Sequence, residues 1–301
     1  MFAMWQHVEL VGGEAIVAQQ ETPIVYQLRL RAELRKLRDA ANFTQKQAAE
    51  RLEWSISKMI RIEGGMSNVS FTDLKALLAL YGVDDPERVE DLAVLAREGR
   101  KSAWWTKYRK SLDPQLFMLI GYEASATRIR QFQSQMLPGL LQTSGYVEAL
   151  ARHIRLSQDA VELGVVIREQ RRRIMVEDGP DMHFVLDEAI VQRSFGDLAS
   201  TLGQLRRLRE VALLPNVDLR ILPFSSGLHP GLQKSFTVLE VPPDGDHVLV
   251  FEEEFKDFVI RESDEESTEY LQRFEEIVQL SLDPEESLGL LDELIAKCPA
   301  D

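Results

Sequence analysis

The feature that most constrains this chain is a pair of short helices expected between Thr44 and Gly65. This stretch reads TQKQAAERLEWSISKMIRIEGG. Thr44 fits a helix N-cap, because its hydroxyl can accept a hydrogen bond from a backbone N–H that the first helical turn leaves unpaired, and Gln47 three residues later completes a capping box. Ser55 fits the same role for a second helix, which Gly64 and Gly65 end. The sequence therefore predicts two capped helices joined by a tight turn.

Helical spacing continues on both sides of this pair. Residues 24–40 place Leu30, Leu34 and Leu37 about one turn apart, and a further apolar stripe runs to Gly82. A short capped pair inside such a bundle is the helix-turn-helix arrangement, whose second helix has the size of the DNA major groove. An ordinary helical bundle without a DNA role is the alternative. We favour DNA binding because the caps, the tight turn and a local positive charge coincide.

Charge is distributed unevenly along the chain. The 301 residues carry a net charge of −14, which alone argues against binding to nucleic acid. Residues 24–82, however, hold ten Lys and Arg against six Asp and Glu, whereas residues 240–301 hold four against twenty. The acidity thus belongs to the C-terminal end, and the N-terminal helices can approach phosphate. An acidic surface at the C-terminal end would suit a basic protein partner.

The segment Thr44–Gly65 resembles the Cro/phage-repressor-like (XRE) helix-turn-helix family, through the motif TQ…AA…L…SxSKxxRIExG. The resemblance implies that Gln45 begins the positioning helix and that residues 55–61 face DNA, while Met59 and Ile62 turn inward. The chain departs from the family at Glu53, where the turn commonly has Gly. We therefore expect Glu53 to adopt a left-handed backbone conformation at some cost in energy.

Two isoleucines stand where the second helix is expected to carry solvated polar groups. An aliphatic side chain in the major groove can pack on the C5-methyl group of thymine, and Ile56 is placed for that contact; the alternative is packing on Trp54 or a neighbouring helix. Ile60 either touches the sugar-phosphate wall or closes the domain core. Arg61 can reach guanine or a phosphate, and Lys58 a phosphate. The expected DNA-binding residues are Thr44, Gln45, Ser55, Ile56, Ser57, Lys58 and Arg61.

The pattern becomes mixed after about Trp104, and the fold class expected is an all-α helix-turn-helix N-terminal domain followed by an α+β C-terminal domain. The domains expected are an N-terminal extension (1–23), the helix-turn-helix domain (24–82), a linker helix (83–103) and the α+β domain (104–301). In that last domain we expect helices at Ala126–Gln135, Ser144–Ile154, Asp159–Val176, Leu198–Leu213, Asp264–Leu282 and Pro284–Lys297, and strands at Met182–Leu186, Val217–Leu222, Ser235–Val241 and His247–Phe251.

Residues with catalytic or metal-binding spacing are scarce. The chain has no HExxH, P-loop, GxSxG or GxGxxG motif, five scattered histidines and a single cysteine. Asp187 and Glu188 follow a strand, and with residues 252–254 they suggest an enzyme carrying a DNA-binding domain; the alternative is a helix N-terminus, where acidic residues are favourable. We expect no enzyme activity, cofactor or metal. The N-terminus lacks a basic leader and no apolar run is long enough for a membrane span, which favours a cytoplasmic protein.

The C-terminal part contains the segments LPGLLQTSGYVEAL (137–150), IREQRRR (167–173), FVLDEAIVQRSFG (184–196), QLRRL (204–208), VDLRILPFSSGLHPG (217–231) and VLVFEEEF (248–255). In combination they resemble actinomycete XRE-type regulators of the WhiJ and Scr kind, whose second domain is sometimes called antitoxin-like. The resemblance implies a DNA-binding regulator whose second domain responds to a ligand or to a small partner protein, and a homodimer on double-stranded DNA is expected. An interaction module that acts mainly through its protein partner remains an alternative. Any pocket is expected between residues 223–231, 138–143 and 252–254.

Overall fold

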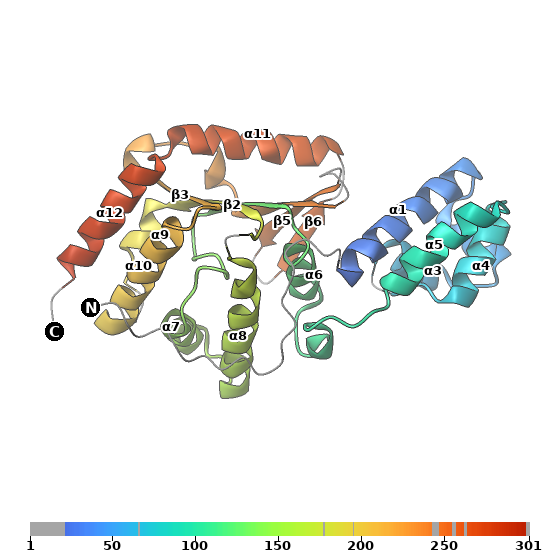
Figure 1. Cartoon of the computed structure of the whole chain (residues 1–301), viewed down its shortest axis with the longest axis horizontal. Helices are drawn as coiled ribbons and strands as arrows, with labels where there is room; N and C mark the ends of the chain where they lie inside the picture. The colour runs from blue at the N-terminus through green and yellow to red at the C-terminus, as the bar shows by residue number, and fades with distance from the viewer. Residues whose placement is uncertain are drawn as a thin grey trace.

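The computed structural model describes residues 22–65, 67–176, 178–194, 196–242, 247–254, 257–261 and 264–298. The expected N-terminal extension lies almost wholly outside these residues. The described chain has an all-α N-terminal region and a mixed α+β region, which confirms the expected fold class (Figure 1). None of the described helices is long and apolar enough to cross a membrane.

Five helices form the N-terminal region: α1 (Pro23–Ala40), α2 (Gln45–Arg51), α3 (Ile56–Glu63), α4 (Phe71–Leu80) and α5 (Pro86–Glu98). Helix α5, which we expected in a linker, contributes Leu92, Ala93 and Ala96 to the same buried core as the other four. Ile62 and Met59 are buried in this core, as expected. The core also holds Leu30, Leu34, Ala48, Ala49, Leu74, Leu77 and Leu78.

The α+β region is built on one six-stranded sheet with the order β3-β2-β1-β4-β5-β6. Strands β1, β2 and β3 are parallel, whereas β4, β5 and β6 continue the sheet as an antiparallel meander from β1. The strands are β1 (Arg128–Gln133), β2 (Asp181–Asp187), β3 (Val217–Leu222), β4 (Phe236–Val241), β5 (His247–Glu254) and β6 (Asp257–Arg261).

The expected helix at Ala126–Gln135 is wrong, because this segment is β1 in the middle of the sheet. Ile129 and Phe132 would share one face of a helix, but here they lie on opposite faces of the sheet and are both fully buried. Pairing with β2 on one side and β4 on the other outweighs the local helical pattern.

Helices cover both faces of the sheet, and Figure 1 shows α11 (Asp264–Leu280) alone on one side. Its Tyr270, Phe274 and Ile277 pack on Phe132 and Phe236. The opposite face holds the larger core. The other helices of this region are α6 (Pro114–Glu123), α7 (Ser144–Ile154), α8 (Gln158–Arg171), α9 (Glu188–Gln192), α10 (Leu198–Ala212) and α12 (Pro284–Lys297), with short 3₁₀ turns at Thr106–Tyr108, Arg172–Ile174, Phe224–Ser226 and Pro230–Leu232.

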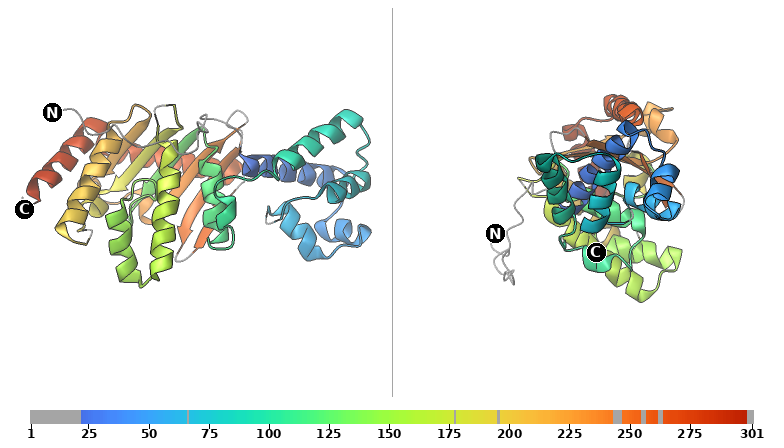
Figure 2. Two further views of the ribbon diagram at one scale, coloured as in Figure 1. Left: turned by 60° about the horizontal axis from the view of Figure 1, so that its bottom comes forward. Right: turned by 90° about the vertical axis from the view of Figure 1, so that its right-hand side faces the viewer.

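Helix α1 belongs to both regions. Its first turns place Ile24, Val25 and Leu28 in the core of the α+β region, whereas its later turns place Leu30 and Leu34 in the N-terminal core. Figure 2 shows this helix reaching from the N-terminal bundle to the α+β region. The two regions are therefore joined by a continuous helix as well as by the chain that follows α5.

Candidate nucleic-acid interface

The helix pair is set by side-chain caps and by one left-handed residue. The Thr44 hydroxyl accepts a hydrogen bond from the Gln47 N–H at 3.2 Å, and the Gln47 side chain accepts one from the Thr44 N–H at 2.9 Å. Ser55 caps α3 by accepting from the Lys58 N–H at 3.2 Å. Glu53 has φ 55°, which confirms its expected left-handed conformation. The exposed residues Thr44 and Ser55 thus lie at the starts of α2 and α3, where backbone N–H groups can approach phosphate.

The outer face of α3 brings together Ile56, Ser57, Ile60 and Arg61. The isoleucines are 41% and 50% exposed, so neither closes the core, and Ser57 and Arg61 are exposed as well. Arg61 has no ion-pair partner among the described residues. Two aliphatic groups, a hydroxyl and a guanidinium therefore face solvent on a capped helix of eight residues.

Lys58 has a structural role that the sequence did not suggest. Its Nζ lies 2.6 Å from an Asp73 carboxylate oxygen on α4 and 3.7 Å from the centre of the Trp54 ring. Burial raises the pKa of Asp73, but hydrogen bonds from Lys58 and Ser70 outweigh it, and the pKa is lowered overall. The lysine thus ties α3 to α4, and a phosphate would have to compete with this ion pair.

Gln45 also has a partner inside the domain. Its amide nitrogen donates to Glu63 at 2.8 Å, and Glu63 in turn accepts from the Arg38 guanidinium at 2.7 and 3.1 Å. The hydrogen bond to Glu63 raises the pKa of Arg38 despite partial burial. The Glu63 side chain is only 3% exposed. This buried pair fixes the end of α3 to α1. The sequence does not predict it, because residues 38 and 63 lie 25 positions apart on different helices.

Two further exposed cations lie on the neighbouring helices α2 and α4. Arg51 at the end of α2 and Lys75 on α4 are exposed, and the Lys75 ammonium lies 4.6 Å from the centre of the Phe71 ring. We did not single out these residues from the sequence, although their charge contributes to the local positive balance. They add positive charge to the surface of the helix-turn-helix domain, which would favour an approach to phosphate.

The junction between the two regions contains a buried arginine. The Arg31 guanidinium on α1 donates to the Tyr122 hydroxyl on α6 at 3.0 Å. It also lies against Gly65, directly after α3, where φ is 75° and a Cβ atom would overlap the guanidinium. Tyr122 packs on Phe251 of β5, with ring centres 6.1 Å apart. A chain of contacts therefore runs from the end of α3 through Arg31 to the central sheet.

Three of the separated C-terminal motifs meet around residues 137–143. Gln142 accepts from the Arg168 Nε at 2.6 Å and donates to the Leu137 carbonyl at 2.6 Å, while Gln204 accepts from the Thr143 N–H at 2.8 Å. Burial, followed by the neighbouring Arg171, lowers the pKa of Arg168 to about 10. These motif residues hold one loop in place against α8 and α10.

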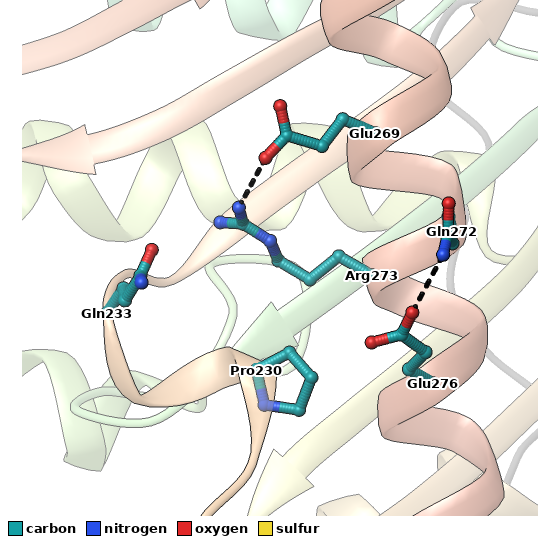
Figure 3. A pocket seen from close by; sticks show the side chains of 6 residues that line it. All are labelled: Pro230, Gln233, Glu269, Gln272, Arg273 and Glu276. Atoms are coloured by element: carbon teal, nitrogen blue, oxygen red, sulfur yellow. Dashed lines mark hydrogen bonds and ion pairs between the residues drawn. The ribbon is translucent and has the colours of Figure 1, made fainter.

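The pocket expected between residues 138–143 and 223–231 is not formed by the described residues. The first loop packs into the core on one face of the sheet, whereas His229 of the second contacts Phe132 on the face that α11 covers. A separate cavity of about 280 Å³ lies between α11 and residues Pro230 and Gln233 (Figure 3). The side chains of residues 253 and 254 lie outside the described set.

Asp187 and Glu188 both accept hydrogen bonds from backbone N–H groups. Asp187 lies at the N-terminus of a helix, as one of the two interpretations expected. Asp187 caps α9 by accepting from the Ala189 N–H at 2.8 Å, and Glu188 accepts from the Phe224 N–H at 2.7 Å. Glu252 is 2% exposed and pairs with Lys234 at 3.1 Å. Among the described residues, no group of three or more His, Cys, Asp or Glu side chains is placed to hold a metal ion.

Comparison with protein-family models gives two matches. A model described as a helix-turn-helix domain matches residues 29–92, from the middle of α1 into α5. A model described as a domain of unknown function, DUF5753, matches residues 118–293. No curated protein and no solved structure matches the chain. The first match confirms the helix-turn-helix domain, a kind of domain that binds DNA. Because the second match spans more than half of the 301 residues, the chain belongs to the DUF5753 family.

Proposed function

We propose that this protein is a sequence-specific, DNA-binding transcriptional regulator whose C-terminal domain responds to a small partner protein or a ligand. The observation that carries the proposal is the exposed face of α3, where Ile56, Ser57, Ile60 and Arg61 face solvent on a helix whose inner face is buried. As in the XRE family that this segment resembles, α3 would enter the major groove. The protein would act in the cytoplasm as a homodimer, each subunit reading one half-site.

The roles of the α3 residues follow from their chemistry. Ile56 would pack on a thymine methyl group, and Arg61 would donate to guanine or to a phosphate. Ser57 can bond to a base or to the backbone. Thr44 and Ser55 would place helix N-termini against phosphates, whereas Gln45 and Lys58 would keep α3 in position through Glu63 and Asp73.

A response of α3 to the C-terminal domain is supported by the junction. Arg31 contacts both Gly65, at the end of α3, and Tyr122 in the α+β core. A partner or ligand that favours one position of α6 would therefore alter the support of α3 through buried contacts. We further propose that the C-terminal domain binds rather than catalyses, since Asp187 and Glu188 are occupied in holding backbone.

The proposal is tested by recovering DNA bound to the protein from its own cells and titrating the recovered sequence at physiological salt. We expect a palindromic motif whose half-sites lie about one helical turn, roughly 10 base pairs, apart. Arg61→Ala should weaken binding by about 10- to 100-fold if the guanidinium reads guanine. Arg173→Ala, at an exposed arginine of the C-terminal region, is the matched control and should bind as the parent does. Equal affinity for the recovered motif and for shuffled DNA would refute the proposal.

A further inference from the structure

The loop between β3 and β4 exposes large apolar side chains. Phe224, Leu228 and Leu232 are 61%, 91% and 57% exposed, and Leu280 at the end of α11 is 41% exposed. Single exposed leucines are common on protein surfaces, but three large apolar side chains exposed by one loop, residues 223–235, indicate a contact surface. We call these four residues the apolar loop surface.

This loop is held at four points, so its leucines are presented by a defined backbone. The Phe224 N–H donates to Glu188 at 2.7 Å, and the Ser226 hydroxyl donates to the Leu280 carbonyl at 2.8 Å. The His229 side chain is 4% exposed and meets the Phe132 ring edge to face at 5.9 Å. Gly231 lies so close to the Phe132 ring that a Cβ atom would overlap it. Binding to this surface would therefore require little ordering of the loop.

An acidic cavity adjoins the loop. Figure 3 shows it between Pro230 and Gln233 of the loop and four residues of α11: Glu269, Gln272, Arg273 and Glu276. Its volume of about 280 Å³ is at the small end for a ligand pocket and suits one long side chain. Arg273 is paired with Glu269 at 2.7 Å and stacks on Tyr270 at 4.8 Å, so its charge is already balanced. The exposed glutamates of α11 are Glu265, Glu269, Glu275 and Glu276.

We propose that the apolar loop surface and the adjoining cavity bind a protein segment that is amphipathic and basic. Its apolar side chains would pack on Leu228 and Leu232, and a lysine or arginine would enter the cavity towards Glu276, because Glu269 is already paired with Arg273. The glutamates of α11 favour a basic partner and repel anionic lipid, which argues for a protein segment rather than a membrane surface. This inference rests on the proposed function, because it names the chemistry of the partner to which the C-terminal domain responds.

The test uses the full chain and two labelled synthetic probes. One is an amphipathic helical peptide of leucine and lysine, and the other has glutamate at every lysine position. By fluorescence anisotropy we expect the leucine–lysine peptide alone to bind. The double variant Leu228→Ser/Leu232→Ser should weaken that binding by about tenfold or more, because exposed apolar anchors dominate such contacts. Glu276→Gln, which leaves the Arg273–Glu269 pair in place, should weaken it and reduce its dependence on salt.

Leu213→Ser is the matched control, because Leu213 is 58% exposed and lies outside the loop, directly after α10. Peptide binding unchanged by the double leucine variant, equal binding of both peptides, or binding of neither would overturn the inference. Binding of phosphatidylserine vesicles in place of the peptide would overturn it in favour of a lipid surface. Operator affinity measured on the same samples separates the two proposals: a parent protein without operator preference refutes the regulator, whereas intact operator binding with loop-independent peptide binding refutes only this surface.

Discussion

The outer face of α3 and the apolar loop surface both expose aliphatic side chains, but in opposite electrostatic surroundings. Ile56 and Ile60 stand on a capped helix that also exposes Arg61. Leu228 and Leu232 stand on an irregular loop beside the glutamates of α11. The comparison teaches that the charge around exposed apolar side chains decides which partner they can bind. Neighbouring cations favour DNA, a polyanion that presents thymine methyl groups in its major groove, whereas neighbouring carboxylates favour a basic protein.

The largest expected effect comes from removing the Arg38–Glu63 ion pair, which holds α3 in place but does not touch the apolar loop surface. Arg38→Met leaves Glu63, at 3% exposure, as a buried charge without its guanidinium, which should cost about 3–5 kcal/mol of unfolding free energy. Urea unfolding should show the loss, and operator binding should disappear. The matched control is Arg97→Met, because Arg97 and Glu90 form an exposed pair at 3.4 Å that is worth at most about 1 kcal/mol. Equal losses in both variants would show that the Arg38–Glu63 pair does not hold α3.

A pair of glycines tests whether the junction supports α3. Gly65 and Gly82 have nearly the same backbone angle, φ 75° and 73°, but only at Gly65 would a Cβ atom meet another group, the Arg31 guanidinium. Gly82→Ala should cost about 1–2 kcal/mol for the left-handed conformation alone. Gly65→Ala should cost more, because Arg31 must leave its place beside Tyr122. Equal urea midpoints for the two variants would contradict a role of Arg31 in this support.

Two buried tyrosines sharpen the comparison between the regions. The Tyr81 hydroxyl has no hydrogen-bond partner among the described residues, whereas the Tyr146 hydroxyl accepts from the Leu137 N–H at 3.2 Å. Tyr146→Phe should therefore cost about 1–3 kcal/mol by leaving that N–H unpaired, and Tyr81→Phe should be nearly neutral at pH 7. Thermal unfolding of both variants measures the difference.

The buried hydroxyl of Tyr81 should make the protein less stable at high pH. Burial, followed by Glu63, raises the pKa of Tyr81 to about 12 from a model-compound value of 10.0. The unfolded chain therefore releases this proton first, so the contribution is present below pH 10 and is lost as pH rises towards 12. The difference in stability between the parent and Tyr81→Phe should shift in favour of the variant across this window. A pH-independent difference would contradict the assignment.

The smallest effect concerns the contact proposed for Ile56. Replacing thymine by uracil in the operator removes one methyl group, whose burial is worth about 0.8 kcal/mol, or roughly fourfold in affinity. The parent protein should lose this factor at the contacted base, whereas Ile56→Ala should bind both DNAs equally. Ile60→Ala, which removes the neighbouring exposed isoleucine, should keep the sensitivity to uracil. Sensitivity that survives in Ile56→Ala would assign the methyl contact to another residue.

Local signals made the helix pair predictable. Thr44, Gln47, Ser55 and Glu53 act within three residues of their own positions, so their caps and left-handed turn could be inferred from the sequence. The β1 strand could not, because it is decided by neighbours more than 45 residues away in the chain. The Arg38–Glu63 pair and the Arg31–Tyr122 hydrogen bond join residues 25 and 91 positions apart. For Lys58 we expected a phosphate contact. Its ion pair with Asp73 could not be inferred, because Asp73 lies on another helix.

The sharing of α1 between two cores bears on how oligomeric state should be measured. A fragment that ends after α5 would leave Ile24, Val25 and Leu28 in water, although each is at most 7% exposed in the intact chain. Burying such side chains is worth about 1.5–3 kcal/mol each, so the fragment would gain a strong tendency to self-associate through this end of α1. A dimer of the isolated N-terminal fragment would then result from the exposed end of α1 and would give no information on the oligomeric state of the whole chain.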